Sequence, residues 1–257
     1  MLRLKPVYKD ELITLYHGNS LEVLKKFEEN SVDVVITDPP FFLSNGGVSC
    51  KNGRMVSVDK GEWDKLDSMT IEEFYTEILV QLKRILKFDG SIWIFGTMHN
   101  VYVLGYLMNK LEFKIMNNIT WQKTNPAPNL GCRMFTHSTE TILWAKQNKK
   151  SKHIFNYHLM KKINGNKQMK DVWTTTTIKK SEKKYGNHPT QKPIDIIERM
   201  ILASTNEDSI ILDPFIGSGT TLLAAKMLNR KSIGIDVEKE YINLANKRIK
   251  GLKTSEE

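Results

Sequence analysis

Cysteine is scarce in this chain, and long apolar runs are missing. Only Cys50 and Cys132 occur among its 257 residues, which excludes a disulfide framework and a cysteine-rich zinc site. No apolar run approaches the roughly 20 residues that cross a bilayer, and the opening MLRLKPVYKDEL lacks an apolar secretory stretch. We therefore expect a soluble protein of a reducing, cytoplasmic compartment with no membrane partner.

Positive charge is concentrated in one segment. The chain holds 38 Lys+Arg against 29 Asp+Glu, a formal charge of +9. Residues 146–187 contain twelve lysines and two acidic residues, so this window carries +10 and the remainder −1. The window has no arginine, but it includes the aromatic residues Phe155, Tyr157, Trp173 and Tyr185. Lysines interleaved with aromatics favour a surface that neutralises phosphates and stacks on bases, although a solvated lysine-rich insertion has the same composition.

Outside that window, strand-like and helical patterns alternate. Strands are expected at 12–17, 32–37, 91–97, 113–121, 139–145, 210–212 and 232–235. Helices are expected at 20–29, 70–86, 101–111, 194–204, 220–229 and 239–250. This alternation predicts an α/β fold with a doubly wound, mostly parallel sheet, in which 113–121 and 139–145 form an antiparallel pair at an edge. The length fits a single domain, 1–257, with a basic insertion at about 146–187.

A glycine-bearing turn follows one of the C-terminal strands. Residues 210–221 read IILDPFIGSGTT, so a strand ends at Asp213 and a helix begins near Thr220. Gly217 and Gly219 let the backbone approach a ligand, and the helix N-terminus offers N–H groups to an anion. The next strand ends at Asp236, which is well placed to bind both hydroxyls of a ribose. The pattern predicts a nucleoside-containing ligand with an anionic or zwitterionic tail.

Several ligands could use such a turn. A dinucleotide fingerprint requires a third glycine where Leu222 stands, and no Gly-Lys-Ser/Thr follows as in a phosphate-binding loop. S-adenosylmethionine fits better, with its adenosine at Asp236 and its methionine carboxylate and ammonium at the turn and Asp213. A tight turn that binds nothing remains the structural alternative.

A second motif, Asp38-Pro39-Pro40-Phe41, follows the strand VDVVIT. Two prolines fix φ and remove two N–H donors, so the loop is rigid and presents acceptors. Asp38 Oδ and the Pro39 carbonyl can both face one amino group, while Phe41 covers the ring that carries it. Two acceptors would orient the lone pair of a weakly nucleophilic aromatic amine toward an electrophile. Taken alone, the tetrapeptide is also compatible with an ordinary strand-to-loop turn.

Together the two motifs resemble those of the DNA amino-methyltransferases. That family carries (Asp/Asn/Ser)-Pro-Pro-(Tyr/Phe) as its catalytic motif and Asp-Pro-Phe-x-Gly-Ser-Gly as its cofactor motif. The order found here is similar to that of the β class, a circularly rearranged Rossmann-like fold with its target-recognition region between the motifs. The resemblance covers nearly the whole chain and includes HPTQKP at 188–193. Segments 41–47, 56–65, 117–146 and 167–173 are similar to the DpnA-type adenine methylases, which modify GATC.

The resemblance implies methyl transfer from S-adenosylmethionine to adenine N6 in DNA, without a metal. The adenine would flip out of the duplex into the pocket between Asp38 and the cofactor turn, where Phe41 would stack on it. The implied catalytic residues are Asp38, Pro39, Pro40 and Phe41. The implied cofactor-binding residues are Asn19, Asp38, Thr190, Gln191, Lys192, Asp213, Phe215, Gly217, Ser218, Gly219, Thr220, Thr221 and Asp236. The alternative for Asn19 is a helix N-cap or a turn residue.

The remaining expectations concern DNA and other partners. Expected DNA contacts are Lys51, Arg54, Lys60, Arg133, Lys161, Lys162, Lys167, Lys170, Lys179 and Lys180. Because the window lacks arginine, its candidate base readers are Asn156, Asn164, Asn166, Gln168 and Asn187. A homodimer and a cognate restriction endonuclease are candidate partners, and the activity would be associated with the nucleoid. Cytosine-N4 methylation, RNA methylation and non-enzymatic DNA binding are the alternatives, and Asp38 favours adenine because Ser is typical of the cytosine enzymes.

Overall fold

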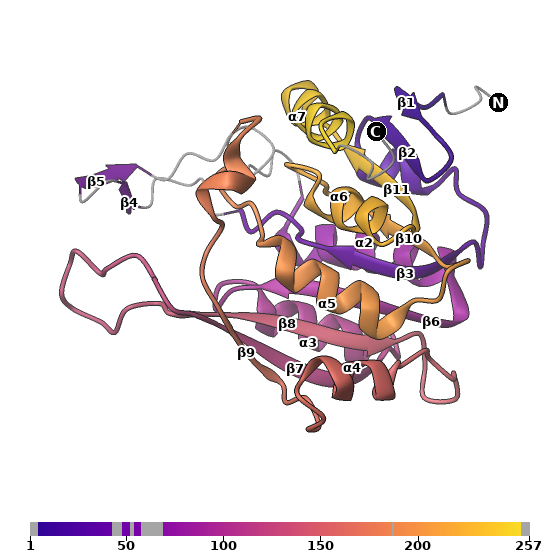
Figure 1. The fold of residues 1–257 in the computed structure, drawn as a ribbon, viewed down its shortest axis with the longest axis horizontal. Coiled ribbons are helices and arrows are strands. Elements are labelled where there is room, and N and C mark those ends of the chain that lie inside the picture. Colours follow the sequence, from indigo (N-terminus) through magenta and orange to yellow (C-terminus); the bar gives the residue numbers. More distant parts are fainter. Residues whose placement is uncertain (1–4, 43–47, 52–53, 58–68, 187, 253–257) are drawn as a thin grey trace.

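The computed structural model describes residues 5–42, 48–51, 54–57, 69–186 and 188–252 (Figure 1). Between 43 and 68 it gives only the backbone pairing of a short antiparallel hairpin, β4 (Val48–Lys51) with β5 (Arg54–Ser57). The side chains of Lys51, Arg54 and Lys60 therefore lie outside the described part, as does the candidate base reader Asn187. Within the described ranges, no helix is long and apolar enough to cross a membrane.

A nine-stranded mixed sheet, ordered β1-β2-β11-β10-β3-β6-β8-β7-β9, forms the centre of the molecule. Its strands are β1 (Tyr8–Lys9), β2 (Ile13–His17), β3 (Val32–Thr37), β6 (Leu86–Gly96), β7 (Lys114–Lys123), β8 (Thr139–Lys146), β9 (Val172–Thr175), β10 (Ile210–Asp213) and β11 (Lys231–Asp236). Neighbours from β2 to β6 are parallel, and β8 is antiparallel to both β6 and β7. This confirms the predicted mostly parallel sheet with an antiparallel edge. One further strand, β9, pairs in parallel outside β7.

Helices cover both faces of this sheet (Figure 1). They are α1 (Ser20–Leu24), α2 (Ile71–Ile85), α3 (Val101–Lys110), α4 (Tyr157–Ile163), α5 (Ile194–Ser204), α6 (Thr220–Met227) and α7 (Lys239–Lys250), with the 3₁₀ turn η2 (Lys180–Lys183). Side chains of a strand alternate between faces, so Ile92 and Ile94 of β6 pack with α2 and α3 whereas Trp93 and Phe95 pack toward α5. Burial on both faces explains why the central strands read as continuous apolar runs.

Local capping explains the helix that is predicted at 70–86. Thr70 Oγ1 accepts the N–H of Glu73 at 3.2 Å, and the Glu73 carboxylate accepts the N–H of Thr70 at 2.7 Å. This capping box fixes the start of α2 where the sequence indicates it. Helices α5 and α7 coincide with their predicted ranges, while α1 ends at Leu24, short of the predicted 29.

The basic window is more closely integrated with the sheet than its weak periodicity indicates. Its segment α4 joins the end of α5, where the N–H of Asn156 binds the Ala203 carbonyl at 2.9 Å. Trp173 of β9 is 5% exposed, and its ring centroid lies 6.1 Å from that of Trp93. The expectation that the aromatics of this window stack on bases is therefore wrong for Trp173, because β9 turns that ring into the core.

The side chains of two candidate base readers bind backbone carbonyls of the protein. The Asn156 amide donates to the carbonyls of Leu202 and Thr205 at 2.8 and 2.9 Å. The Asn164 amide donates to the carbonyls of two nearby residues, Lys167 and Gln168, at 3.1 and 3.2 Å. Both amides therefore stabilise local structure, at the start and the end of α4.

Polar residues gather where four neighbouring parallel strands end. Asp236 is the last residue of β11 and Asp213 the last of β10, while Asp38 directly follows β3 and Asn19 lies just beyond β2. The register pairs His17 with Asp236, which places the ends of β2 and β11 side by side. Because carboxyl ends of parallel strands meet at one edge of the sheet, this edge is where a ligand site is expected.

Candidate functional site

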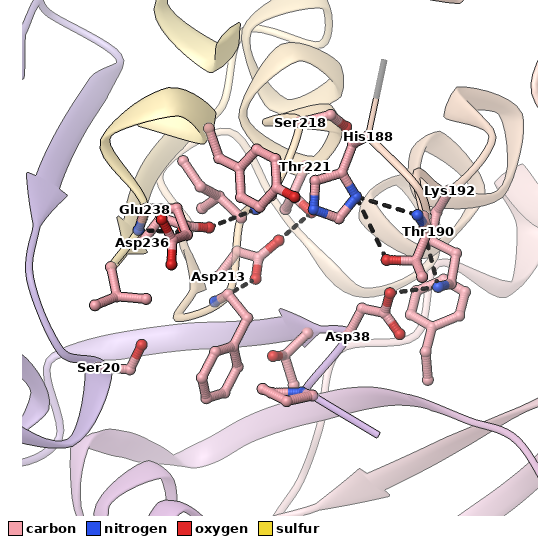
Figure 2. Close-up of a pocket in the computed structure, with 18 of the residues that line it drawn as sticks. Ser20, Asp38, His188, Thr190, Lys192, Asp213, Ser218, Thr221, Asp236 and Glu238 are labelled. Carbon is pink, nitrogen blue, oxygen red and sulfur yellow. Dashed lines mark hydrogen bonds and ion pairs between the residues drawn. The ribbon is translucent and has the colours of Figure 1, made fainter. Parts of the chain in front are cut away.

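A cavity of about 430 Å³ opens at that edge (Figure 2). Asp236, Asp213 and Asp38 lie in a row along it, each from a different strand end. Of the thirteen predicted cofactor residues, all but Gly219 line it: Asn19, Asp38, Thr190, Gln191, Lys192, Asp213, Phe215, Gly217, Ser218, Thr220, Thr221 and Asp236. The structure thus brings together residues that are up to 217 positions apart (19 to 236) in one wall.

Glycine is required at two positions of the turn after β10. Gly217 and Gly219 have φ of 47° and 75°, values that favour glycine. A Cβ at Gly217 would lie 2.8 Å from His188 Nε2, and one at Gly219 would lie 2.6 Å from the Ala245 Cβ. The His188 ring, whose Nδ1 accepts the N–H of Thr190 at 3.2 Å, therefore covers the turn. This contact places the 188–192 segment over the cavity.

The side-chain carboxylates of Asp213 and Asp236 are buried and held by short hydrogen bonds. Asp213 accepts from Thr221 Oγ1 at 2.6 Å, and Asp236 accepts the N–H groups of Gly217 and Glu238 at 2.8 and 2.9 Å. Burial raises the pKa of Asp213 to about 7 and that of Asp236 to about 6, despite these hydrogen bonds. Both carboxylates would therefore be stabilised as anions by a ligand that brings hydroxyl donors or positive charge.

A buried arginine fixes the turn from behind. Arg248 of α7 is 3% exposed, and its Nη1 donates to the Ser218 carbonyl at 2.8 Å and to Ser218 Oγ and Thr220 Oγ1, each at 2.9 Å. The motifs in the sequence did not indicate this residue. Its position in the helix could have indicated burial, because Arg248 lies on the apolar face of α7 together with Ala245 and Ile249.

Asn19 begins α1, as its structural alternative predicts. Its Oδ1 accepts the N–H of Glu22 at 3.3 Å, which makes it the N-cap of the helix. The side chain is also part of the cavity wall. The N-cap role is confirmed, and a contact with an adenine ring remains a prediction.

Asp38 already has a cationic partner in this structure. The Lys192 ammonium forms an ion pair with Asp38 Oδ2, and it lies 3.7 Å from Glu140 Oε2. Lys192 is only 7% exposed. Burial alone would lower its pKa, but the carboxylates of Asp38 and Glu140 raise that pKa above the ordinary value. The lysine that the resemblance assigns to the cofactor thus pairs with the carboxylate that it assigns to catalysis, and Glu140 joins the site without having been predicted from the sequence.

Phe41 does not line the large cavity. It belongs to a second cavity of about 240 Å³, whose wall also includes Thr97, Trp121, Lys123, Glu140, Thr177 and Ile178. Thr190, Gln191 and Lys192 line both cavities and so separate them. The Pro39-Pro40 turn puts Asp38 and Phe41 on the walls of adjoining cavities, and both side chains lie next to the Lys192 ammonium. Their joint action on one base stays a prediction. Tyr75 holds this turn by donating its hydroxyl to the Pro40 carbonyl at 2.6 Å.

Lysines on the two helical segments of the basic window, α4 and η2, lie at opposite ends of α5. Those of α4, Lys161 and Lys162, lie near its C-terminal end, where Asn156 binds the backbone. Those of η2 lie near its N-terminal end, because the Glu182 carboxylate accepts the N–H of Ile194 at 3.1 Å. An α-helix of 11 residues is about 16 Å long. The second group is therefore the one beside the cavities.

Another exposed segment leaves the sheet at the second cavity. The connection from β7 to β8 begins after Lys123 and ends before Thr139, next to two residues of that cavity wall. Arg133, an expected DNA contact, is exposed on this connection near Phe135, whose side chain is 97% exposed. In Figure 1 the connection from β7 to β8 projects from the same side of the molecule as the β4–β5 hairpin.

Comparison with known proteins gives a consistent result. Residues 32–247 match the family model N6_N4_Mtase, described as DNA methylase. The chain is 56% identical to Type II methyltransferase M2.LlaDCHI of Lactococcus lactis subsp. cremoris, over 97% of this chain and 93% of that protein. It is 54% identical to Type II methyltransferase M2.DpnII of Streptococcus pneumoniae, over 97% and 94%. The crystal structure of an M1.HpyAVI–SAM complex is similar to it with a TM-score of 0.65 at 28% identity, over 93% of this chain and 100% of that one.

Proposed function

Since this chain belongs to the N6_N4_Mtase family of DNA methylases, we propose that it transfers a methyl group from S-adenosylmethionine to adenine N6 in DNA, within GATC. The observation that carries the proposal is the pair of cavities that adjoin at Thr190, Gln191 and Lys192, where Lys192 forms an ion pair with Asp38 of the large cavity. One cavity is large enough for a nucleoside cofactor, and the other has the aromatic wall that a nucleobase requires. The GATC assignment is supported by the segments similar to the DpnA-type methylases and by the identity to M2.DpnII.

The residues of the large cavity fit S-adenosylmethionine. Its volume of about 430 Å³ lies within the range of small-molecule sites. Asp236 would accept the ribose hydroxyls, the turn at Gly217 and Gly219 would hold the carboxylate, and Asp213 would accept the ammonium. When bound, the cofactor supplies an electrophilic methyl group on a sulfonium.

The second cavity is the proposed site of the flipped adenine. Phe41 and Trp121 provide aromatic surface on which a base can stack, which offsets the few kcal/mol of unstacking. At the boundary of the cavities, Asp38 Oδ and the Pro39 carbonyl would accept the two hydrogens of N6. Held in this way, the N6 lone pair points toward the large cavity. Rigid placement of the amine, rather than strong base catalysis, is then the main contribution of the motif.

Analysis of the methylated base and of its sequence context tests this function directly. Unmethylated genomic DNA is incubated with the protein and cofactor, then digested to nucleosides and, in parallel, sequenced with a methylation-sensitive method. We expect N6-methyladenine, confined to GATC. Appearance of N4-methylcytosine would replace the adenine assignment with the cytosine alternative, and methylation outside GATC would overturn the proposed site.

The raised carboxyl pKa values predict a pH-dependent effect of the cofactor on stability. A carboxyl with a folded pKa above its unfolded value contributes stability that is fully present below the unfolded pKa and is lost as the pH rises through the folded one. For Asp213 and Asp236 this loss is complete above about pH 7. The ammonium of bound S-adenosylmethionine would favour the anionic form of Asp213 and so restore part of the folding stability that is lost at high pH. We therefore expect S-adenosylmethionine to raise the melting temperature more at about pH 8 than at about pH 5.5.

Differential scanning fluorimetry at the two pH values, with and without the cofactor, measures this effect. The variant Asp213→Asn is the control, because its side chain does not titrate and the extra shift at high pH should shrink. An equal or smaller shift at high pH in the unmodified protein would contradict the assignment of Asp213 to the ammonium.

We propose that DNA is held by the lysines beside the cavities, together with Arg133. Removing one lysine that neutralises a phosphate should reduce the slope of log binding constant against log salt by about 0.9 for duplex DNA. Reversal of Lys180, Lys183 and Lys184 to Glu should therefore flatten the slope by about 2 to 3. The same reversal at Lys161, Lys162 and Lys167, near the far end of α5, is the matched control. Equal effects of the two triple variants would indicate that the whole window binds DNA, as the sequence predicts for Lys161, Lys162, Lys167, Lys170, Lys179 and Lys180.

The wider setting belongs to the same proposal. Both relatives described above are named Type II methyltransferases, which supports a role in a restriction–modification system with a cognate endonuclease. A cytoplasmic location at the nucleoid follows from the proposed DNA substrate. We further propose that residues 1–257 form a single methyltransferase domain and that residues 146–187 recognise the target. We also propose that the protein assembles as a homodimer.

A further inference from the structure

Lys192 lies where the two cavities meet. Its side chain is part of the wall of both. Its ammonium contacts one carboxylate from each wall, Asp38 of the large cavity and Glu140 of the second. The position of this single charge therefore determines which of the two carboxylates it neutralises.

The ion pair with Asp38 conflicts with the binding of a target amine. The proposed function requires an Asp38 oxygen to accept a hydrogen of N6, at the carboxylate that now binds the ammonium. Lys192 is 7% exposed, so its charge cannot reach bulk water without unpacking the wall. Loss of the counter-ion of a buried ammonium strongly destabilises the folded protein, because an uncompensated charge is left inside it. When Lys192 leaves Asp38, it needs another carboxylate within the wall.

Glu140 is such a carboxylate. Its Oε2 lies 3.7 Å from Lys192 Nζ, so a shift of about 1 Å would bring the two atoms to hydrogen-bond distance. Its Oε1 is fixed at 2.6 Å by Lys123 Nζ, which itself lies 5.0 Å from the Trp121 ring centroid. Glu140 can therefore receive a second cation while it stays in place.

The surroundings of Lys192 favour a short movement of a charged group. The Thr190 carbonyl accepts from Nζ at 3.2 Å, and the ring centroids of Phe41 and Phe95 lie 5.5 and 5.1 Å from it. Aromatic faces attract a cation without fixing it in one direction. The ammonium can thus shift between the two carboxylates while it remains over the same rings.

We propose that Glu140 is a positioning residue that receives the Lys192 ammonium when the target amine displaces it from Asp38. The inference rests on the proposed function. Without a base in the second cavity, Lys192 neutralises Asp38. With a base bound, Lys192 pairs with Glu140, and the Asp38 carboxylate accepts a hydrogen of the amine in its place.

The variant Glu140→Gln tests this step. Glutamine keeps the size of the side chain and can still accept from Lys123, but it lacks the charge that would hold Lys192. The ammonium then stays on Asp38, and we expect kcat for DNA methylation to fall about 10²-fold. The dissociation constant of S-adenosylmethionine should not change, because Glu140 does not line the large cavity. As a matched control, Asp10→Asn removes the partner of Lys226 in a 3.0 Å ion pair of another region and should leave kcat unchanged.

A double-mutant cycle separates this role from a merely structural one. In a Lys192→Met background there is no ammonium to receive, so adding Glu140→Gln should change kcat little. Single-turnover rates with excess enzyme and melting temperatures are measured for all four proteins, so that slow variants remain quantifiable. An equal loss of rate in both backgrounds, or a wild-type rate in Glu140→Gln, would overturn the inference. If the Lys192→Met protein does not fold, the split between kcat and cofactor affinity in Glu140→Gln decides. Failure of the unmodified protein to methylate adenine would instead refute the proposed function.

Discussion

Replacement of Asp38 by Ala is expected to lower methyl transfer about 10³-fold, because it removes the acceptor that orients the target amine. Asp38 directly follows β3 and lines the large cavity, next to Lys192, which lines both cavities. Glu140 is not expected to replace it, because its Oε1 is bound by Lys123 and its Oε2 lies 3.7 Å from the Lys192 ammonium. The loss should appear in kcat, while the affinity for S-adenosylmethionine, which depends on the turn, Asp213 and Asp236, changes little.

The measurement is transfer of a tritiated methyl group into DNA that contains GATC, together with calorimetric titration of the cofactor. The Ala variant deprives Lys192 of one partner, but Glu140 remains within 3.7 Å of the ammonium. Asp38→Asn is a second variant that preserves the shape of the side chain, and Asp10→Asn controls for the loss of a carboxylate elsewhere. Full activity of Asp38→Ala with normal cofactor affinity would sink the catalytic assignment.

The second large effect is expected at the cofactor turn, in Gly219→Ala. A methyl group at this position would lie 2.6 Å from the Ala245 Cβ and 3.0 Å from its Cα, so either the turn or α7 must move. The left-handed backbone, with φ of 75°, adds a cost of about 1 to 2 kcal/mol for a residue with a Cβ. A displacement of the turn by about 1 Å would weaken cofactor binding about 10²-fold.

Gly165→Ala provides a matched control for this substitution. Gly165 has a similar φ of 63°, but a Cβ there would meet no atom of the described residues within 4 Å. The two variants share the backbone cost and differ in the clash, so the difference in melting temperature between them measures the close packing of the turn against α7. Calorimetric titration and melting temperatures should show weakened binding in Gly219→Ala alone. Equal cofactor affinities would contradict the role of that packing.

Local sequence patterns were sufficient to predict the parts of the molecule that local chemistry determines. Strand ends marked by Asp213 and Asp236 were recognisable because an apolar run stops at a carboxylate. The predicted ranges of α2 and α7 agree with the structure, in which a Thr70–Glu73 capping box begins α2 and basic residues occupy the last turn of α7. Each of these strand ends and helix starts depends on residues that are close together in the chain, so a short stretch of sequence is enough to predict it.

The contacts between distant segments could not be predicted in the same way. Lys192 and Asp38 are 154 positions apart, and neither their pairing nor the nearby Glu140 has a local signature. The separation of Asp38 from Phe41 depends on the direction in which the Pro39-Pro40 turn leaves β3. Strand β9 is short and largely exposed, so its period is weak and its pairing with β7 comes from tertiary packing. An acidic residue such as Glu140 near the start of an otherwise apolar strand is the one sequence signal that could have indicated the missed ion pairs.

The position of β10 in the sheet has a consequence for the protein during its own synthesis. Strands β11 and β10 lie between β2 and β3, and the Ile210 N–H binds Asp33 from 177 positions away. On the ribosome, a nascent chain that has not yet reached this segment has the catalytic turn but lacks the middle of its sheet. Such long-range pairing forms late. The catalytic and cofactor motifs therefore meet only after β10 and β11 have been synthesised, and a chain that stops before Ile210 would contain Asp38 without Asp213, Asp236 or the turn between them.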